Sequence, residues 1–309
     1  GLDLYAEPIG TPLQEAKIFS AQLGGSAGNI AIGLRQQGCS CSLLTGISDD
    51  GIGKFTKNYL IRYEIATDLI CEFPKNKNTL AIVDTNGERT QATIYRDAPA
   101  DLQINEDSFN AIDFSSFSHF IITGTSLTKN PSRKLVLKIM KAAKDFGKQV
   151  IFDIDYRVGT WQSQAKAITV LHEAVDASTI LVGNDVEFDF MAGKPGKGKL
   201  LAESIGHSSK NITIYKMGKK GCLLFTHGEK TKFDSYKVNE IKPTGAGDAF
   251  LAGFCATYVS HNNIREAVLN GAATAAIVVT KVGCADAMPT KKQILEFVNA
   301  NNTPKIQRI

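Results

Sequence analysis

One stretch of the chain combines glycines and a carboxylate at a spacing that suits phosphate chemistry. The stretch PTGAGDAF, residues 243–250, places Gly245, Ala246 and Gly247 before Asp248 and continues into an apolar segment without a charge. The first N–H groups of a helix lack intrahelical partners and carry partial positive charge, and glycines let a phosphate approach them closely. A carboxylate there can take the proton of an attacking hydroxyl, so the pattern indicates phosphoryl transfer. The simpler alternative is that Asp248 only caps its helix.

Neither of the two common nucleotide-binding motifs accounts for this stretch. The glycine-rich residues 193–200, GKPGKGKL, lack the Gly-Lys-Ser/Thr ending of a Walker loop. The GAGDAF stretch has Phe250 where a dinucleotide-binding fingerprint needs its third glycine. The predicted anion site therefore consists of backbone donors at a helix start together with one carboxylate.

A strand–helix–strand unit in the middle of the chain indicates the kind of scaffold that positions these groups. Residues 117–124 and 149–157 are strand-like, and residues 131–147 between them are helix-like. Pro131 suits the first turn of that helix and Gly147 can end it. One face of the helix is apolar and consists of Leu135, Val136, Ile139, Met140, Ala143 and Phe146.

The same alternation continues through residues 167–228 and ends in apolar helices at about residues 249–259 and 265–280. It predicts an α/β fold with a doubly wound, mostly parallel sheet flanked by helices. Ligands of such folds gather at the carboxyl ends of the strands. We expect one domain that spans residues 1–309, because α/β domains often reach this length.

Two short runs depart from this rhythm and predict a small β lid. Residues 79–96 form two alternating runs around Asn86-Gly87, a strong hairpin signal. With the run KIFSAQL, they predict a lid whose strands come from about residues 11–23 and 78–99. An open lid sheet can pair with a second copy of the chain, so a homodimer through the lid is expected.

Composition excludes several classes of protein. The net charge of +4 comes from dispersed lysines and arginines, without the basic runs interleaved with aromatics that indicate nucleic-acid binding. No apolar stretch reaches the 18 residues of a membrane span. The six cysteines form no CxxC pair, so neither a disulfide scaffold nor a zinc site is expected. With no signal-peptide pattern at its start, the chain is expected in the cytoplasm, and its opening GLDLY indicates that residues precede Gly1.

Five ordered motifs resemble those of the ribokinase-like (PfkB-type) carbohydrate kinases. The stretch LGGSAGNIAIGLRQQG, residues 23–38, is similar to the first family signature, and KPTGAGDAFLAG, residues 242–253, is similar to the second. The other three are TGISDDGIGKF, VGNDVEF and YKMGKKG. This resemblance covers essentially the whole chain and implies a ribokinase-like fold and ATP-dependent phosphorylation of a carbohydrate.

The resemblance implies a role for each matched residue on the nucleotide side. Asp248 would be the base, and the N–H groups of Gly245, Ala246 and Gly247 would form the anion hole. Asn184 and Glu187 would hold Mg²⁺ through water, since Mg²⁺ usually keeps several of its waters. The residues implied to line the nucleotide are Asn184, Lys216, Gly218, Gly221 and Asn270.

On the sugar side the resemblance points to Asp3, Gly24, Gly25 and Asn29, which could hydrogen-bond a polyol at the strand ends. Asp3 could equally be a turn residue, and Asn29 could be a helix N-cap. Arg96 and Arg157, in two further matched stretches, would supply guanidinium forks, which suit a carboxylate. A sugar acid explains two arginines better than a neutral sugar does.

Four stretches resemble the subfamily of inositol catabolism that phosphorylates 5-dehydro-2-deoxygluconate at its C6 hydroxyl. They are YRDAPADL, FDIDYR followed by Trp161, IKPTGAGDAF and VGCADAMPT. Asn184 stands where that subfamily tends to have threonine. Kinases of the same family that act on 2-keto-3-deoxygluconate or fructose are therefore the alternative.

Lys242 departs from the family pattern. Many members have an aspartate at this position, six residues before the base, and there the acid helps to hold a monovalent cation beside the anion hole. We hypothesise that the Lys242 ammonium replaces this ion; the alternative is a solvated lysine.

Two alternatives from other classes remain open. Residues 24–28, GGSAG, satisfy the G-x-S-x-G pattern of a hydrolase with Ser26 as nucleophile, although none of the histidines lies in a matching motif. A kinase-like domain could also bind sugar or nucleotide as a regulator without catalysis. The presence of Asp248 speaks against that, because loss of the base would mark such a protein.

Overall fold

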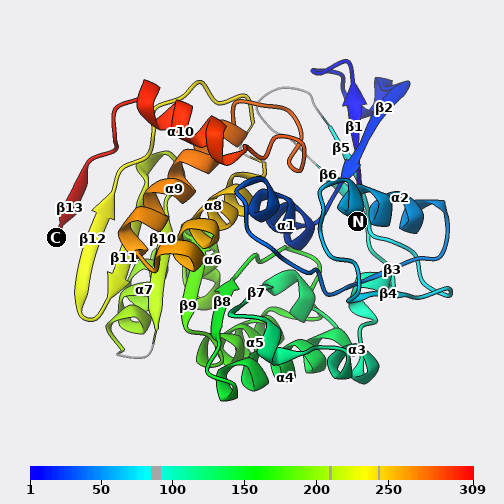
Figure 1. Ribbon diagram of the computed structural model, residues 1–309, viewed down its shortest axis with the longest axis horizontal. Coiled ribbons are helices and arrows are strands. Elements are labelled where there is room, and N and C mark those ends of the chain that lie inside the picture. The colour runs from blue at the N-terminus through cyan, green and yellow to red at the C-terminus, as the bar shows by residue number, and fades with distance from the viewer. Residues whose placement is uncertain (85–91, 209–210, 243) are drawn as a thin grey trace. The chain divides into compact units, whose positions relative to one another are not determined.

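The structure is a computed structural model that describes residues 1–84, 92–208, 211–242 and 244–309 (Figure 1). The chain divides into two compact units. Unit 1 consists of Gly1–Ile104 and Lys237–Asn302, and unit 2 consists of Asn105–Tyr236 and Thr303–Ile309. The single domain expected over the whole chain stays a prediction.

Unit 2 contains a seven-stranded sheet with the order β13-β12-β11-β10-β9-β8-β7. Its strands are β7 (His119–Thr123), β8 (Gln149–Asp153), β9 (Ile180–Asn184), β10 (Ile212–Lys216), β11 (Cys222–Thr226), β12 (Glu229–Phe233) and β13 (Ile306–Arg308). Strands β7 to β10 run parallel, and β11 to β13 are antiparallel to their neighbours. The buried runs Val150–Phe152 and Ile180–Val182 are typical of strands covered on both faces.

Helices flank this sheet (Figure 1), which confirms the α/β class predicted from the sequence. They are α3 (Glu106–Asn110), α4 (Ser132–Asp145), α5 (Gln164–Asp176), α6 (Asp185–Met191) and α7 (Gly198–His207). The predicted apolar face of α4 is buried from Leu135 to Ala143. Phe146 is the exception, because it lies at the C-cap and is 61% exposed while its ring stacks on Phe114.

The sheet is more mixed than the sequence indicated. The turn from β10 to β11 runs through the short 3-10 helix Gly218–Lys220 and is closed by a hydrogen bond from Met217 N to Gly221 O of 2.8 Å. A turn this tight joins antiparallel strands, whereas a parallel pair needs a crossover of a dozen or more residues. The parallel part of the sheet therefore ends at β10.

Unit 1 contains a four-stranded sheet with the order β2-β1-β5-β6. Its strands are β1 (Leu2–Glu7), β2 (Ile18–Leu23), β5 (Leu80–Val83) and β6 (Ala92–Tyr95). Strands β2, β5 and β6 lie within the ranges predicted for the lid, and β5 and β6 pair antiparallel as a hairpin would. The predicted turn at Asn86-Gly87 lies outside the described residues. That this sheet acts as a lid stays a prediction.

The remaining elements of unit 1 are mostly helices. They are α1 (Ser26–Gln36), α2 (Gly51–Arg62), α8 (Ala246–His261), α9 (Ile264–Val278) and α10 (Lys291–Ala300), with the short paired strands β3 (Thr45–Ile47) and β4 (Ile70–Glu72). The apolar helices predicted at 249–259 and 265–280 correspond to α8 and α9. Most of α8 is buried, from Asp248 to Ala256, as expected of a helix that is apolar all round. No helix in the described ranges is long and apolar enough to span a bilayer.

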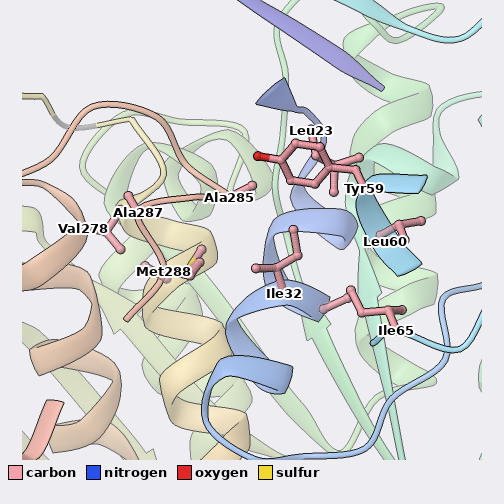
Figure 2. Close-up of a cluster of buried hydrophobic side chains, with 11 residues drawn as sticks. Leu23, Ile32, Tyr59, Leu60, Ile65, Val278, Ala285, Ala287 and Met288 are labelled. Carbon is pink, nitrogen blue, oxygen red and sulfur yellow. The ribbon is translucent and has the colours of Figure 1, made fainter. Parts of the chain in front are cut away.

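A buried apolar cluster joins these helices to the segment that follows α9 (Figure 2). Its members are Leu23, Ala31, Ile32, Tyr59, Leu60, Ile65, Ala249, Val278, Ala285, Ala287 and Met288. Burial of each large apolar side chain stabilises the fold by roughly 1.5–3 kcal/mol. The cluster therefore fixes α1, α2 and α8 to one another at the carboxyl end of β2.

Asp50 organises the start of α2. Its side chain accepts hydrogen bonds from Ser48 Oγ (2.6 Å), Ile52 N (3.0 Å) and Gly53 N (3.2 Å). Lys77 forms an ion pair with the other carboxylate oxygen at 2.9 Å. The Ser48 hydroxyl and then the Lys77 ammonium hold the pKa of Asp50 well below its usual range.

We expect replacement of Asp50 by alanine to lower the free energy of unfolding by about 1 kcal/mol, because the helix loses its N-cap. Since the pKa of Asp50 is depressed in the folded state, the stabilisation by its charge is present above pH ~4 and is lost as the pH falls. Urea unfolding of the wild type and of Asp50→Asn between pH 2 and 7 measures this, and the difference between their free energies of unfolding should narrow steadily below pH ~4. Asp49→Ala, an exposed neighbour, is the control; equal midpoints for it and Asp50→Ala would contradict the assignment.

Candidate active site

The anion site predicted at the start of α8 has the backbone geometry that it requires. Gly245 is the N-cap and has φ 85° and ψ −7°, a left-handed conformation that favours glycine. The N-cap glycine has no side chain that could cap the helix, and Gly245, Ala246 and Gly247 are all partly exposed. The first N–H groups of α8 therefore keep their capacity to bind an anion.

Asp248 is the third residue of α8 and is 8% exposed. Its Oδ2 accepts a hydrogen bond of 2.8 Å from Asn29 Nδ2 on α1. The N-cap of α8 is Gly245, so the simple interpretation of Asp248 as the capping residue does not hold. A carboxylate this well buried needs hydrogen bonds and opposite charge nearby to remain ionised.

Asn29 lies in the first half of α1, whose N-cap is Gly25 with φ 98°. The alternative prediction, that Asn29 is a helix N-cap, is therefore wrong. Asn29 is 4% exposed, and its Oδ1 is buried without a hydrogen-bond partner among the described residues. Since buried amide oxygens normally have a donor, Asn29 can accept one more hydrogen bond.

Asp3 stands on β1 near the same helix start. Burial and the negative charge of Asp248 raise the pKa of Asp3 to about 6. Gly24 passes so close that a Cβ there would lie 1.9 Å from Asp3 Oδ1. Asp3 belongs to a strand, so the alternative of a turn residue is wrong. The structure thus brings Asp3, Gly24, Asn29 and Asp248 together in unit 1.

Lys242 lies beside this group and is 6% exposed, which rules out the alternative of a solvated lysine. Its Nζ donates to Thr244 O at 2.7 Å and to Cys284 Sγ at 3.6 Å. Tyr5 Oη donates to the same sulfur at 3.7 Å. Burial raises the pKa of the Cys284 thiol, and the Lys242 charge acts in the opposite direction.

The sequence did not indicate Tyr5 or Cys284 as site residues. They are separated by 279 positions, so no local pattern indicates that they meet. Cys284 lies against the anion site itself, since a Cβ on Gly245 would be 2.7 Å from its sulfur. The one sequence signal for Cys284 is its place in VGCADAMPT, a stretch that resembles the subfamily but does not by itself indicate a contact with Gly245.

Arg96, predicted to bind a substrate carboxylate, forms an ion pair with Asp101 Oδ2 at 2.5 Å. Its side chain is 14% exposed, and Asp101 also accepts from Thr79 Oγ1 at 2.9 Å.

Asn270 Nδ2 donates to Gln37 Oε1 and to Gly253 O, both at 2.8 Å. These two bonds tie α9 to α1 and α8, and the placement of Asn270 near adenine stays a prediction.

Asn184 and Glu187, predicted to hold Mg²⁺ through water, form a capping box at the start of α6 in unit 2. Asn184 Oδ1 accepts from Glu187 N at 2.9 Å, and Glu187 Oε2 accepts from Asn184 N at 2.7 Å. Burial raises the pKa of Glu187, against the charge of Lys216. The second carboxylate oxygen takes no part in the capping box, and an oxygen donor of this kind suits hydrated Mg²⁺.

Further charged groups lie at the carboxyl ends of β8 and β10. Lys216 Nζ is 3.4 Å from Asp153 Oδ1, and both side chains are mostly buried. Arg157 Nη2 is 2.8 Å from Asp155 Oδ1, and the Arg157 side chain is 55% exposed. Asp155 has φ 35°, a left-handed conformation that Asp tolerates better than most residues. Predicted residues Gly218 and Gly221 form the turn that follows Lys216.

In the described part of the chain, no three His, Cys, Asp or Glu side chains gather as ligands of one metal ion. None of the six cysteines takes part in a disulfide in the structure. Ser26, the nucleophile of the hydrolase alternative, lies in the first turn of α1 and is 9% exposed.

The sequence pattern of the pfkB family carbohydrate kinases matches residues 2–291. The chain belongs to this family. It is therefore a carbohydrate kinase, which leaves the hydrolase and the non-catalytic regulator without support. ATP is the co-substrate that this family implies, and a divalent cation accompanies it.

Curated relatives are similar over nearly their full length. The 5-dehydro-2-deoxygluconokinase of Bacillus subtilis (strain 168) is 32% identical over 307 residues, which cover 97% of this chain and 94% of the relative. The 5-dehydro-2-deoxygluconokinase of Clostridium tetani (strain Massachusetts / E88) is 32% identical over 306 residues, 96% of this chain and 90% of the relative.

Solved structures show the ribokinase-like fold. A fructokinase from Xylella fastidiosa with bound ATP has a TM-score of 0.85 at 20% identity, over 97% of this chain and 95% of that one. Aminoimidazole riboside kinase from Salmonella enterica, in complex with its riboside and an ATP analogue, has a TM-score of 0.82 at 20% identity, over 96% of each chain.

Proposed function

We propose that this carbohydrate kinase transfers the γ-phosphoryl group of ATP to a sugar acid, 5-dehydro-2-deoxy-D-gluconate, at its C6 hydroxyl. The observation that carries the proposal is the 32% identity with 5-dehydro-2-deoxygluconokinase of Bacillus subtilis over 97% of the chain. Products are ADP and the 6-phosphate. Because ATP is the proposed co-substrate, we propose that the reaction takes place in the cytoplasm.

Asp248 is the proposed base. It accepts the proton of the hydroxyl as that oxygen forms a bond to the γ-phosphorus and the bond to the bridging oxygen of ADP breaks. The N–H groups of Gly245, Ala246 and Gly247 stabilise negative charge on the transferred group. The left-handed conformation of the N-cap glycine, which has no side chain that could cap the helix, supports this assignment.

The sugar side of the proposal rests on unit 1. Asp3 and Asn29 form hydrogen bonds with hydroxyl groups of the sugar. The buried Asn29 Oδ1 can accept one such bond. Gly24 and Gly25 let the sugar approach the backbone. Arg96 binds the carboxylate, and Arg157 of unit 2 has the same proposed role. A guanidinium has five N–H donors, so an internal aspartate and a ligand carboxylate can share it.

The nucleotide side of the proposal rests mainly on unit 2. Lys216 and the turn at Gly218 and Gly221 line the nucleotide, and Asn270 contacts the adenine. Asn184 and Glu187 hold Mg²⁺ through water. When bound, Mg²⁺ neutralises charge on the phosphates. The uncommitted oxygen of Glu187 supports this choice of metal.

The test of the substrate is the rate of phosphate transfer from labelled ATP to 5-dehydro-2-deoxygluconate, 2-keto-3-deoxygluconate, fructose and ribose under one set of conditions. We expect the highest kcat/KM with the first. A higher value with 2-keto-3-deoxygluconate or fructose would assign the chain to the corresponding kinase, which is the alternative within the family.

We expect Asp248→Asn to lower kcat by about 10²–10⁴-fold, because the hydroxyl loses its proton acceptor. Affinity for ATP, measured by calorimetry, should stay within about twofold. Asp145→Asn, at an exposed residue at the end of α4, is the control. An Asp248→Asn enzyme with wild-type turnover would exclude Asp248 as the base.

We also propose that the Lys242 ammonium replaces a monovalent cation beside the anion site. A buried ammonium is costly unless opposite charge and acceptors surround it. Lys242 donates to Thr244 O, directly before the N-cap Gly245, and its charge acts on Asp3. A fructokinase double mutant from Vibrio cholerae O395 with a TM-score of 0.84 has been solved with a potassium ion bound.

If Lys242 supplies this charge, turnover should stay within about twofold when KCl is replaced by NaCl or choline chloride at equal ionic strength. Lys242→Met removes the charge at similar volume and should lower kcat, with partial recovery in KCl. Lys237→Met, at an exposed position, is the matched control. A strong requirement of the wild type for K⁺ would refute the replacement.

We propose that the four-stranded sheet of unit 1 pairs with a second copy of the chain. Its edge strand β6 is exposed along its whole length, and Ile18, Ile94 and Tyr95 are 67%, 49% and 60% exposed. Open edges and exposed apolar side chains favour association. Sedimentation equilibrium should give the mass of a dimer at micromolar concentration, and Ile94→Lys should shift it toward the monomer; a wild-type monomer would be the contrary result.

A further inference from the structure

The segment of residues 282–289, between α9 and α10, contacts three separate parts of unit 1. Gly283, with φ 81°, lies against the Gln22 side chain of β2, since a Cβ on this glycine would be 2.1 Å from Gln22 Oε1. At Cys284 the segment lies against Gly245, the N-cap of α8. At Asp286 it accepts hydrogen bonds from Tyr59 and Tyr63 of α2. The segment thus links α2 and the four-stranded sheet to the predicted anion site.

The Asp286 contact is unusual because one exposed carboxylate oxygen serves two phenols. Tyr63 Oη donates to Asp286 Oδ1 at 2.7 Å, and Tyr59 Oη donates to the same oxygen. Tyr59 is 3% exposed, and its ring lies 5.1 Å from the Arg62 guanidinium. Burial and the Asp286 bond raise the pKa of Tyr63 to about 12, so the phenol remains a donor at neutral pH.

Within the 282–289 segment, small and apolar residues lie between and after the polar residues Cys284 and Asp286. Ala285, Ala287 and Met288 are at most 2% exposed and belong to the buried cluster of unit 1. Figure 2 shows the Tyr59 ring packed in this cluster, with its hydroxyl directed toward the part of the chain that carries Ala285. A well-packed segment of this kind transmits a displacement, because protein interiors have few voids that absorb it.

The Cys284 end of the segment contacts the groups that matter for transfer. The sulfur accepts from Lys242 Nζ at 3.6 Å and Tyr5 Oη at 3.7 Å, and it occupies the space next to Gly245. A shift of Cys284 therefore moves the Lys242 ammonium or changes the conformation of Gly245. Either change alters where the first N–H groups of α8 point.

We infer that Asp286 is a positioning residue for phosphoryl transfer. By holding Tyr59 and Tyr63, it fixes the 282–289 segment so that Cys284 supports Gly245 and Lys242. This role rests on the proposed function of the α8 start as the anion site. Asp286 has no part in binding ATP or the acceptor, so its loss acts on turnover and leaves both affinities in place.

The experiment compares kcat and KM for wild type, Asp286→Ala, Asp286→Asn and Tyr63→Phe, with the sugar of the panel that the wild type phosphorylates fastest. We expect Asp286→Ala to lower kcat about tenfold, in the range that a displacement of 1 Å or less produces, with both KM values within about twofold. Asp286→Asn keeps an oxygen acceptor and should retain most of the turnover. Tyr63→Phe keeps the Tyr59 bond and should lower kcat by about two- to threefold.

A double variant separates positioning from loss of stability. If Asp286 acts through Cys284, Asp286→Ala combined with Cys284→Ala should be no slower than the slower single variant, because the two changes share one path. Glu72→Gln, which breaks the exposed pair of Glu72 with Lys57 on α2, is the control and should keep the wild-type kcat.

A folded Asp286→Ala enzyme with kcat within twofold of wild type would overturn the inference, as would multiplicative losses in the double variant. If Asp286→Ala does not fold, the kcat of Tyr63→Phe is the deciding measurement. A wild-type kcat in Tyr63→Phe would then contradict the inference. Failure of the proposed function looks different, because then Asp248→Asn keeps its turnover.

Discussion

The burial of the Asp248 carboxylate at the amino end of α8 is the constraint on which the rest of unit 1 depends. A carboxylate that is 8% exposed loses most of its hydration, and it stays ionised when hydrogen bonds and positive potential replace that water. The start of α8 supplies partial positive charge, and Asn29 supplies a hydrogen bond of 2.8 Å. The buried Lys242 adds a full charge nearby. The cost of burying the Asp248 carboxylate is thus offset by these neighbouring groups.

The same principle appears in unit 2, where two cations at the strand ends each lie beside an acid. Lys216 lies beside Asp153 and Arg157 beside Asp155, so the carboxyl ends of β8 and β10 carry paired charge. Glu187 is held by the capping box of α6. Paired side chains are pre-oriented, which lowers the entropy that a ligand must remove on binding. These pairs therefore organise the strand ends before a ligand arrives.

Local pattern was sufficient to predict the parts of the site that depend on backbone conformation. The glycine at position 245, the acid at 248 and the apolar face of α4 all follow from spacing along a single element. The partners of Asp248 and Gly245 could not be found in this way, because Asn29 and Cys284 are far from them in sequence and meet them through tertiary packing. The predicted burial of Phe146 was wrong for a related reason. Helical periodicity places Phe146 on the apolar face of α4, but it does not indicate that the helix ends at Asp145. The antiparallel pairing of β11 to β13 could not be predicted in this way, because an apolar strand pattern does not indicate the direction in which the strand pairs.

Selectivity between a sugar acid and a neutral sugar does not require a net positive site in the proposed mechanism. Arg96 and Arg157 are each already neutralised by an aspartate, so a ligand carboxylate gains little from long-range attraction. An arginine whose plane is fixed by an aspartate, as that of Arg96 is by Asp101, instead offers oriented N–H donors to a carboxylate. A neutral sugar would leave some of those donors without the second, charged acceptor that a ligand carboxylate supplies. Sites built to hydrogen-bond a substrate group discriminate strongly against ligands that lack it, because the unpaired protein group bears the cost. In the proposed mechanism, an aspartate–arginine pair such as Asp101–Arg96 would therefore act more by rejecting a ligand without a carboxylate than by attracting the correct one.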